Sequence, residues 1–489
     1  MIPSEDIDEL KQKALCADCV GETFLRNEID RKGERRECSY CHSTRESFLI
    51  EEISEKVDQA FNDHFSRTQT EPDGFESALS RDRESAYEWE REGEETVSAI
   101  GEAASISEAV AHDIQRVLED KYADFDTAAM GDETEFDAEA HYAKKSSSDD
   151  DWQTEWRTFA NSLKSEARFF NQTGARHLTS IFKDIEALET RQKGRVVVDA
   201  GPGASITGFY RARVFHTLNA VEEALISPDR NIGPPPSALA RAGRMNAHGI
   251  SVFYGADDPG AALAEIRPPV GSWAVVARFE IIRTLRLLDL TALVDIETKG
   301  SVFDPQYKDR LGRAKFLGNL SQRLTSPVMP DDEPFEYLTT QAVADFLATD
   351  PHMSIDGILF PSVQVAGSAG NVVLFHKASS VERIKLPEGT KVTAHSGYST
   401  EDGCEFDFSV WEEAPKHLSA KKKKRADSFG HLADFPKLSI LSNQSKPKHP
   451  ESLRIDLSSV KVHEIKAVSF KTDVYPVTRH RYIAQDEIF

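Results

Sequence analysis

The residues best suited to chemistry lie in four short segments between residues 209 and 375. These candidates are Arg211 and Arg213 in FYRAR, Arg244, Asn246 and Tyr254 in AGRMNAHGISVFYG, Glu265 in DPGAALAEIRP, and Ser362 and Asn371 in DGILFPSVQVAGSAGNVVLF. A carboxylate can stabilise the oxocarbenium-like transition state of glycosidic cleavage. Arginine side chains bind a diphosphate, an aromatic ring packs on a flat base, and a hydroxyl group near the base or ribose fixes the orientation of the ligand. Each residue alone has a structural explanation, so the prediction depends on the set.

The order of these segments resembles that of a known family. FYRAR, GRMNAHG, FYGADDPGAALAE, YLTTQAVADFL and DGILFPS…GNVVLF together look like the RES domain, which is named for its Arg, Glu and Ser, and they cover about a third of the chain. The resemblance implies a fold similar to that of ADP-ribosyltransferases. It also implies a toxin-like enzyme that degrades NAD⁺ by hydrolysis or phosphorolysis, with NAD⁺ as substrate.

The resemblance assigns roles to the candidate residues. Glu265, Arg244, Ser362 and Tyr254 match the catalytic positions, and Arg211, Arg213, Asn246 and Asn371 are expected to bind substrate. Arg213 competes with Arg211 for one position, and Asn371 is a weaker candidate for which a structural role is favoured.

Two other functions stay open. Some members of the family are reported as protein ADP-ribosyltransferases, which would use the same pocket with a target side chain as nucleophile. A catalytically silent, zinc-containing interaction protein is the third alternative, and it requires that Arg244, Glu265 and Ser362 do not converge. Redox use of NAD is disfavoured, because GPGAS at 201–205 lacks the spacing of a dinucleotide-binding glycine motif.

Four cysteines form two pairs near the N-terminus, Cys16-x2-Cys19 and Cys38-x2-Cys41. Each pair makes a tight turn that directs two thiolates to one point, and two such turns complete the tetrahedron that Zn²⁺ prefers. We expect structural Zn²⁺, because four sulfur ligands leave no open position for catalysis. A redox dithiol or unmetallated thiols are the alternatives.

The helical and strand-like patterns around these residues predict an α+β protein. We expect an N-terminal zinc knuckle and helical domain, followed by an ADP-ribosyltransferase-like RES domain with a mostly antiparallel sheet. The expected regions are a knuckle over 1–45, a helical HEPN-like regulatory domain over 46–190, the catalytic domain over 191–400 and a C-terminal extension over 401–489. The extension should hold a mobile basic insertion around KKKKR at 421–425 and a returning strand within 462–477.

Local patterns predict where several elements begin. Apolar residues with helical spacing predict three helices, in Leu49–Phe61, Val110–Leu118 and Trp152–Phe170, the second capped by Ser105 and Glu108. Asp258 is expected to cap the helix that carries Glu265, with Pro259 in its first turn. Thr339 or Thr340 is expected to cap the helix in TTQAVADFLAT.

Composition limits the partners. The 489-residue chain carries a net charge of −23, which disfavours nucleic acid as a partner because phosphates would be repelled. Neither a secretory signal nor a membrane-spanning run is found, so we expect a cytoplasmic protein with no membrane partner. The expected partners are NAD⁺ and an antitoxin or regulatory protein, and a homodimer is considered. Analogy with the family suggests a role in a toxin–antitoxin system or in antiphage defence. We expect the 1–190 region and the C-terminal tail to restrain the enzyme.

Overall fold

The structure is a computed structural model whose contacts divide the chain into two compact units. It describes residues 6–81, 87–124, 133–192, 194–329, 331–362, 364–365, 369–400, 403–415, 449–469, 472–477 and 479. The first unit contains residues 1–196 and 292–323, and the second contains residues 197–291 and 324–489. The basic segment at 421–425 lies outside the described residues. Within the described ranges, no helix is both long and apolar enough to cross a bilayer.

The first unit combines helices with two small sheets, of strand order β1-β3-β2 and β4-β6-β5. Its helices are α1 (Ile7–Gln12), α2 (Thr23–Lys32), α3 (Ile50–His64), α4 (Gly74–Arg81), α5 (Thr96–Ala104), α6 (Glu108–Lys121), α8 (Asp150–Ser165) and α9 (Gln172–Phe182). Its strands are β1 (Ala14–Cys16), β2 (Glu34–Glu37), β3 (Thr44–Leu49), β4 (Phe65–Arg67), β5 (Glu94–Glu95) and β6 (His141–Lys144). Helix α13 (Tyr307–Thr325) begins in this unit.

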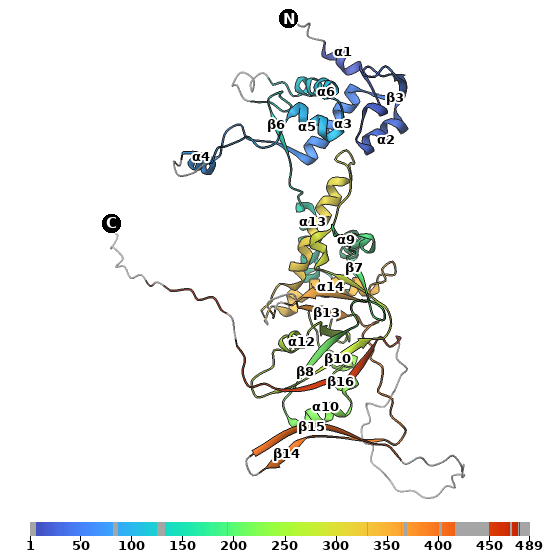
Figure 1. The fold of residues 1–489 in the computed structure, drawn as a ribbon, viewed down its shortest axis with the longest axis vertical. Coiled ribbons are helices and arrows are strands. Elements are labelled where there is room, and N and C mark those ends of the chain that lie inside the picture. The colour runs from blue at the N-terminus through green and yellow to red at the C-terminus, as the bar shows by residue number, and fades with distance from the viewer. Residues whose placement is uncertain are drawn as a thin grey trace, which may run out of the picture. The chain divides into compact units, whose positions relative to one another are not determined.

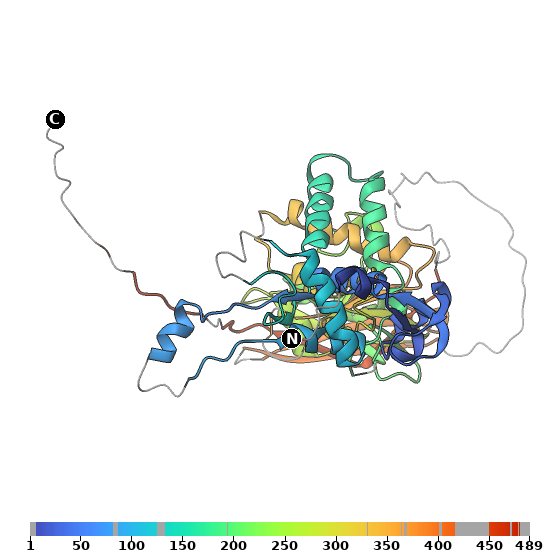
Figure 2. The same ribbon diagram turned by 90° about the horizontal axis from the view of Figure 1, so that it is seen from above.

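One apolar core joins the cysteine-bearing segment to the helices that follow it. Leu15 and Leu25, from the cysteine-bearing segment, are fully buried in the same cluster as Ile53 of α3 and Ile114 of α6. The residues buried along α3 recur every three to four positions, so one face of the helix is apolar. Helices α8 and α9 lie side by side as a hairpin, which Figure 2 shows in teal and green.

The second unit is a mixed sheet of eight strands in the order β16-β10-β8-β9-β13-β12-β11-β7 (Figure 1). Its strands are β7 (Val197–Ala200), β8 (Gly208–Phe215), β9 (Phe253–Ala256), β10 (Trp273–Ile281), β11 (Leu285–Asp289), β12 (Gly357–Pro361), β13 (Gly370–Leu374) and β16 (Leu453–Glu464). All neighbouring strands run antiparallel except β11 and β12. The expectation of an α+β protein with a mostly antiparallel sheet is therefore confirmed.

Two faces of this sheet pack against different elements. Alternate residues of β8 and β10 point to opposite sides. Phe209 and Phe279 are buried with helix α10 (Leu218–Ile226), whereas Ala212 and Val276 pack against helix α12 (Pro259–Glu265). The remaining elements are α11 (Pro228–Asn231), α14 (Glu333–Thr349) and the hairpin of β14 (Lys391–Thr400) and β15 (Gly403–Glu413). Alanines at the α12 contact let this short helix lie close to the sheet.

Three expectations about element starts are wrong. Helix α6 takes Ser107 as its N-cap, whereas Ser105 ends α5 in a left-handed conformation with φ of 51°. Helix α14 begins at Glu333, which places Thr339 and Thr340 inside it, buried. The returning strand covers 453–464, so it overlaps the expected 462–477 in only its last residues.

Tertiary contacts explain these shifts. The Thr340 hydroxyl donates to the backbone oxygen of Arg244. This threonine therefore binds another segment of the chain and does not cap the start of a helix. Strand β16 is fixed by pairing along β10 from Trp273 to Ile281. The third apolar stripe also ends early, because α8 stops at Ser165 and Phe170 is 93% exposed in the turn that follows.

The cap at Asp258 was expected from the sequence and is present. Its carboxylate accepts hydrogen bonds from the amides of Gly260 and Ala261, at 2.7 and 3.0 Å. We expect Asp258→Ala to lower the free energy of local opening of α12 by about 1 kcal/mol, because two helix-start amides lose their acceptor. Faster amide exchange within 259–265, measured by mass spectrometry, would report the loss.

The matched variant is Asp258→Ser, which keeps an acceptor at the cap. Exchange that rises equally in the alanine and serine variants would contradict a capping role.

Candidate active site and cysteine cluster

The site opens where strands β8 and β9 separate. The two strands form a single residue pair, Tyr210 with Ala256, and then diverge. Next to this pair, a Cβ on Gly255 would lie 3.0 Å from the carbonyl oxygen of Tyr210, which is tighter than ordinary packing. Glycine therefore permits the close approach that precedes the separation.

Helix α12 brings Glu265 to this opening and stops there. Arg267, two residues later, has a left-handed φ of 44°, and Pro268 and Pro269 cannot continue the helix. Glu265 is the last residue of the helix, so its carboxylate extends past the helix end.

Ser362, directly after β12, and Asn371, in β13, hold the Glu265 carboxylate. Its Oε1 accepts from Ser362 Oγ and from Asn371 Nδ2, each at 2.7 Å. Asn371 is 4% exposed and stands opposite Phe360 in the strand pair. The other orientation of its amide would place two acceptors together, so the carboxylate fixes Nδ2 toward itself. Three predicted site residues from distant segments therefore meet directly.

A cavity of about 210 Å³ lies beside this carboxylate. Its lining includes Glu265 and Asn371 together with the aromatic residues Tyr210, Tyr254 and Phe360. Aromatic walls beside a carboxylate suit a flat, partly cationic ring attached to a sugar. Tyr210 and Phe360 were not expected from the sequence, because an aromatic residue in a strand is more often part of the core.

Arg211 crosses the gap between the separated strands. Its Nη1 donates to the Tyr254 carbonyl oxygen at 2.7 Å and its Nε to that of Ile232 at 2.8 Å. Burial, with the nearby charge of Arg213, lowers the pKa of Arg211 to about 10. Both bonds go to neutral oxygens, so the cavity wall keeps a positive charge that an anionic ligand can neutralise.

Tyr254 and Asn246 hold the loop before β9. The Tyr254 hydroxyl donates to Asn246 Oδ1 and accepts from the Met245 amide, both at 2.9 Å. Asn246 is buried, and its Nδ2 donates to the backbone oxygens of Arg241, Ala247 and Ile250. The amide of Asn246 is therefore committed to the loop, and its substrate-binding role stays a prediction.

Arg244 lies apart from the cavity next to Glu265. Its guanidinium stacks 4.9 Å from the Tyr337 ring centroid, and Nη1 donates to the Leu324 carbonyl oxygen at 3.1 Å. Burial raises the pKa of Tyr254, and the charges of Arg211 and Arg244 oppose that rise, so both guanidinium groups lie in the surroundings of Tyr254. The structure thus brings Glu265, Ser362 and Asn371 into contact, whereas Arg244 contacts Tyr337 and Leu324 and does not line the cavity beside Glu265.

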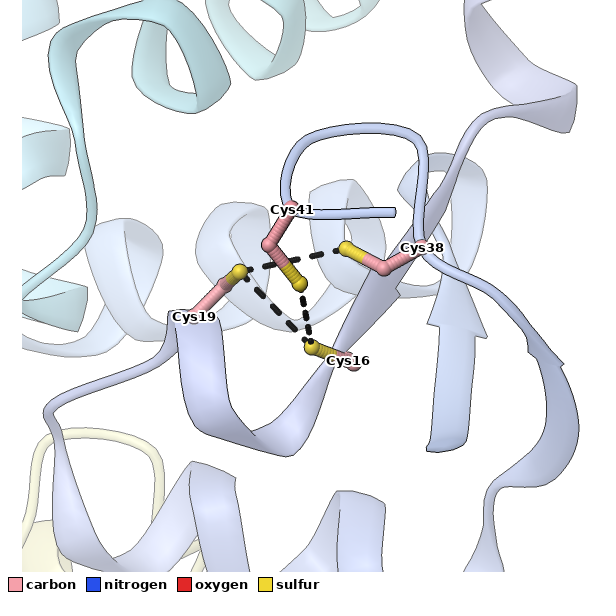
Figure 3. Close-up of side chains that lie close together, drawn as sticks. All are labelled: Cys16, Cys19, Cys38 and Cys41. Atoms are coloured by element: carbon pink, nitrogen blue, oxygen red, sulfur yellow. Dashed lines mark hydrogen bonds between the residues drawn. The ribbon is translucent and has the colours of Figure 1, made fainter. Parts of the chain in front are cut away.

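The four cysteines of the first unit form a second candidate site (Figure 3). Cys16 Sγ lies 3.7 Å from Cys19 Sγ and 3.5 Å from Cys41 Sγ, and Cys19 Sγ lies 3.8 Å from Cys38 Sγ. These distances exceed a disulfide bond of about 2.05 Å and match the edge of about 3.8 Å in a sulfur tetrahedron with 2.3 Å metal–sulfur bonds. The cluster could therefore hold a metal ion.

Comparison with protein families identifies the central part of the chain. Residues 210–395 match the family model of the RES domain. This span contains all of the candidate residues of the second unit, from Arg211 to Asn371. RES domains are associated in general with NAD⁺-related toxin activity. None of the curated proteins matches the chain.

Tyr254→Phe tests the loop that Tyr254 holds. The change leaves the buried Asn246 oxygen and the Met245 amide without their partner, so we expect local opening of 243–250 to become easier by about 1–3 kcal/mol. Amide exchange of that segment measures the effect. Tyr398→Phe is the control, since Tyr398 is 57% exposed. Unchanged exchange in 243–250 would mean that the hydroxyl does not hold the loop.

Proposed function

We propose that this chain degrades NAD⁺ by cleaving the bond between nicotinamide and ribose. The observation that carries the proposal is the Glu265 carboxylate, held at Oε1 by Ser362 and Asn371 beside an aromatic cavity with Arg211 in its wall. The RES-domain match over 210–395 supports the same substrate class. We also propose that the sheet of the second unit is of the ADP-ribosyltransferase type.

Glu265 acts at the ribose. As the bond to nicotinamide breaks, its electron pair moves to the ring nitrogen, which leaves as neutral nicotinamide, and positive charge develops on the sugar. The carboxylate stabilises that charge. Both observed donors bind Oε1, so we assign Oε2 to face the ribose carbon bonded to nicotinamide and the attacking water, whose proton it accepts. In phosphorolysis a phosphate oxygen takes the place of water.

The surrounding residues bind and orient the dinucleotide. Tyr210, Tyr254 and Phe360 supply apolar faces for nicotinamide, and Arg211 supplies charge for the diphosphate. Arg244 acts as a positioning residue, because its contacts with Tyr337 and Leu324 hold the loop whose Met245 amide binds Tyr254. Ser362 and Asn371 orient Glu265.

Nicotinamide release from NAD⁺ by the full-length chain tests this proposal. We expect Glu265→Ala to lower the rate by about 10²-fold or more, because the charge that stabilises the transition state is lost. Ser362→Ala should lose less, since Asn371 still donates to the carboxylate. The control is Glu388→Ala, which changes an exposed glutamate.

The products of the same assay identify the reaction. ADP-ribose indicates hydrolysis, and ADP-ribose 1″-phosphate, formed only with added phosphate, indicates phosphorolysis. Label from NAD⁺ that becomes attached to protein would instead assign ADP-ribosyl transfer. A wild-type chain and a Glu265→Ala variant that both leave NAD⁺ intact would refute NAD⁺ cleavage.

We also propose that the cysteine cluster holds one structural Zn²⁺ and that the first unit regulates the enzyme. Four sulfur ligands would complete the coordination of Zn²⁺, so the ion would serve the fold of the segment and not the reaction. The metal would tie the turn after β1 to the turn after β2, next to the buried Leu15 and Val20.

Metal analysis of the purified chain tests the zinc site. We expect about one zinc per chain, and much less in Cys19→Ser, because a closed site binds weakly once a thiolate is lost. Cys404→Ser is the control, since this fifth cysteine is far from the pairs in sequence. Equal zinc content in Cys19→Ser and the wild type would exclude the cluster as the site.

A further inference from the structure

A second cavity adjoins the one beside Glu265. It has a volume of about 630 Å³ and is called the arginine cavity below. Arg211, Ala212, Tyr254 and Ile266 line both cavities, so the two share a wall where β8 and β9 separate. A ligand larger than a nucleoside can therefore have one part in each.

The arginine cavity is positively charged in a chain whose net charge is −23. Arg211, Arg213 and Arg241 line it, and no acidic side chain is among the described residues of its lining. Arg213 donates to the backbone oxygen of Asn231, and Arg211 likewise bonds to backbone oxygens. Because these acceptors are neutral, the positive charges of the arginines still repel one another. A multiply charged anion would neutralise them and remove that repulsion.

One side of the arginine cavity is apolar. Pro235, Leu239, Ile250 and Val252 line that side. Leu239 is 70% exposed and Ile250 is 38% exposed, so water contacts both. An apolar surface beside guanidinium groups suits a flat heterocycle joined to phosphate.

Arg241 is placed by the same loop that holds Tyr254. Its backbone oxygen accepts from Asn246 Nδ2 at 2.9 Å, and the neighbouring Ala240 oxygen accepts from the Gly249 amide at 2.9 Å. Asn246 in turn binds the Tyr254 hydroxyl. The loop therefore sets the distance between the aromatic wall of the Glu265 cavity and the Arg241 side chain, which is exposed.

We propose that the arginine cavity binds the adenylate half of the dinucleotide, with Arg241 as a further diphosphate-binding residue and Leu239 and Ile250 against the adenine. The inference rests on the proposed function, because it places the nicotinamide half at Glu265. Binding of the adenylate half in the arginine cavity makes the enzyme selective for a dinucleotide over a mononucleotide, since the mononucleotide leaves this cavity empty.

Binding of ADP tests the cavity without cleavage. ADP carries the adenylate and diphosphate and lacks nicotinamide. In the full-length Glu265→Ala chain we expect ADP to bind, and adding Arg241→Ala should weaken it about ten-fold, as for loss of one charge-assisted fork. Because Arg241 holds the loop through its backbone oxygen, the substitution leaves that bond in place.

Arg195→Ala, added to the same Glu265→Ala chain, is the control, since Arg195 is exposed and belongs to the first unit. Calorimetry that detects no ADP binding, or equal affinity with and without Arg241, would overturn the proposal.

A second comparison uses NAD⁺ and nicotinamide mononucleotide as substrates. In the otherwise unmodified chain, Arg241→Ala should lower kcat/KM for NAD⁺ about ten-fold more than for the mononucleotide, mainly through KM. Equal losses for both substrates would mean a merely structural effect and would overturn the proposal. If the wild type cleaves neither nucleotide, the proposed function fails, and ADP binding alone then decides whether this cavity is an adenylate site.

Discussion

The separation of β8 from β9 is the constraint on which the rest of the second unit depends. A continuous sheet would place neighbouring backbones in hydrogen-bond contact and leave no room between them. Here the strands pair at Tyr210 and Ala256 alone, and the Arg211 side chain supplies a donor to the Tyr254 carbonyl oxygen that β8 no longer reaches. The cavity at this opening is lined by Arg211 from β8, by Tyr254 and Gly255 from β9, and by Glu265 at the end of α12.

Much of this site could be predicted from one-dimensional patterns. Asp258 followed by Pro259 marks a helix start from local chemistry alone, and that helix delivers Glu265. The apolar runs around 273–281 and 370–374 form strands because their alternation or burial needs a sheet. Ser362 and Asn371 were candidates by their place between two strands, and their contact with Glu265 follows once those strands pair beside α12.

The remainder depends on contacts between distant segments, which local patterns do not record. Thr340 has the sequence environment of a helix cap, yet it lies inside α14, where its hydroxyl meets the loop at Arg244. Arg244 stacks on Tyr337, a residue of the same helix, and the sequence around GRMN gives no sign of that contact. The aromatic residues and Arg241 line cavities only because β8 and β9 diverge. The sequence FYRAR does not predict that divergence.

Strand β16 has a consequence for how the molecule is made. It is the last strand of the large sheet in chain order, yet it covers β10 and puts Leu453 and Ile455 into the core. During synthesis the edge of β10 stays unpaired until residues 453–464 have left the ribosome. A nascent or prematurely terminated chain therefore presents an open, apolar edge of the kind that quality-control proteases and chaperones engage. Sealing of this sheet edge therefore depends on residues 453–464, and a chain that ends before them keeps the backbone groups along that edge of β10 unpaired.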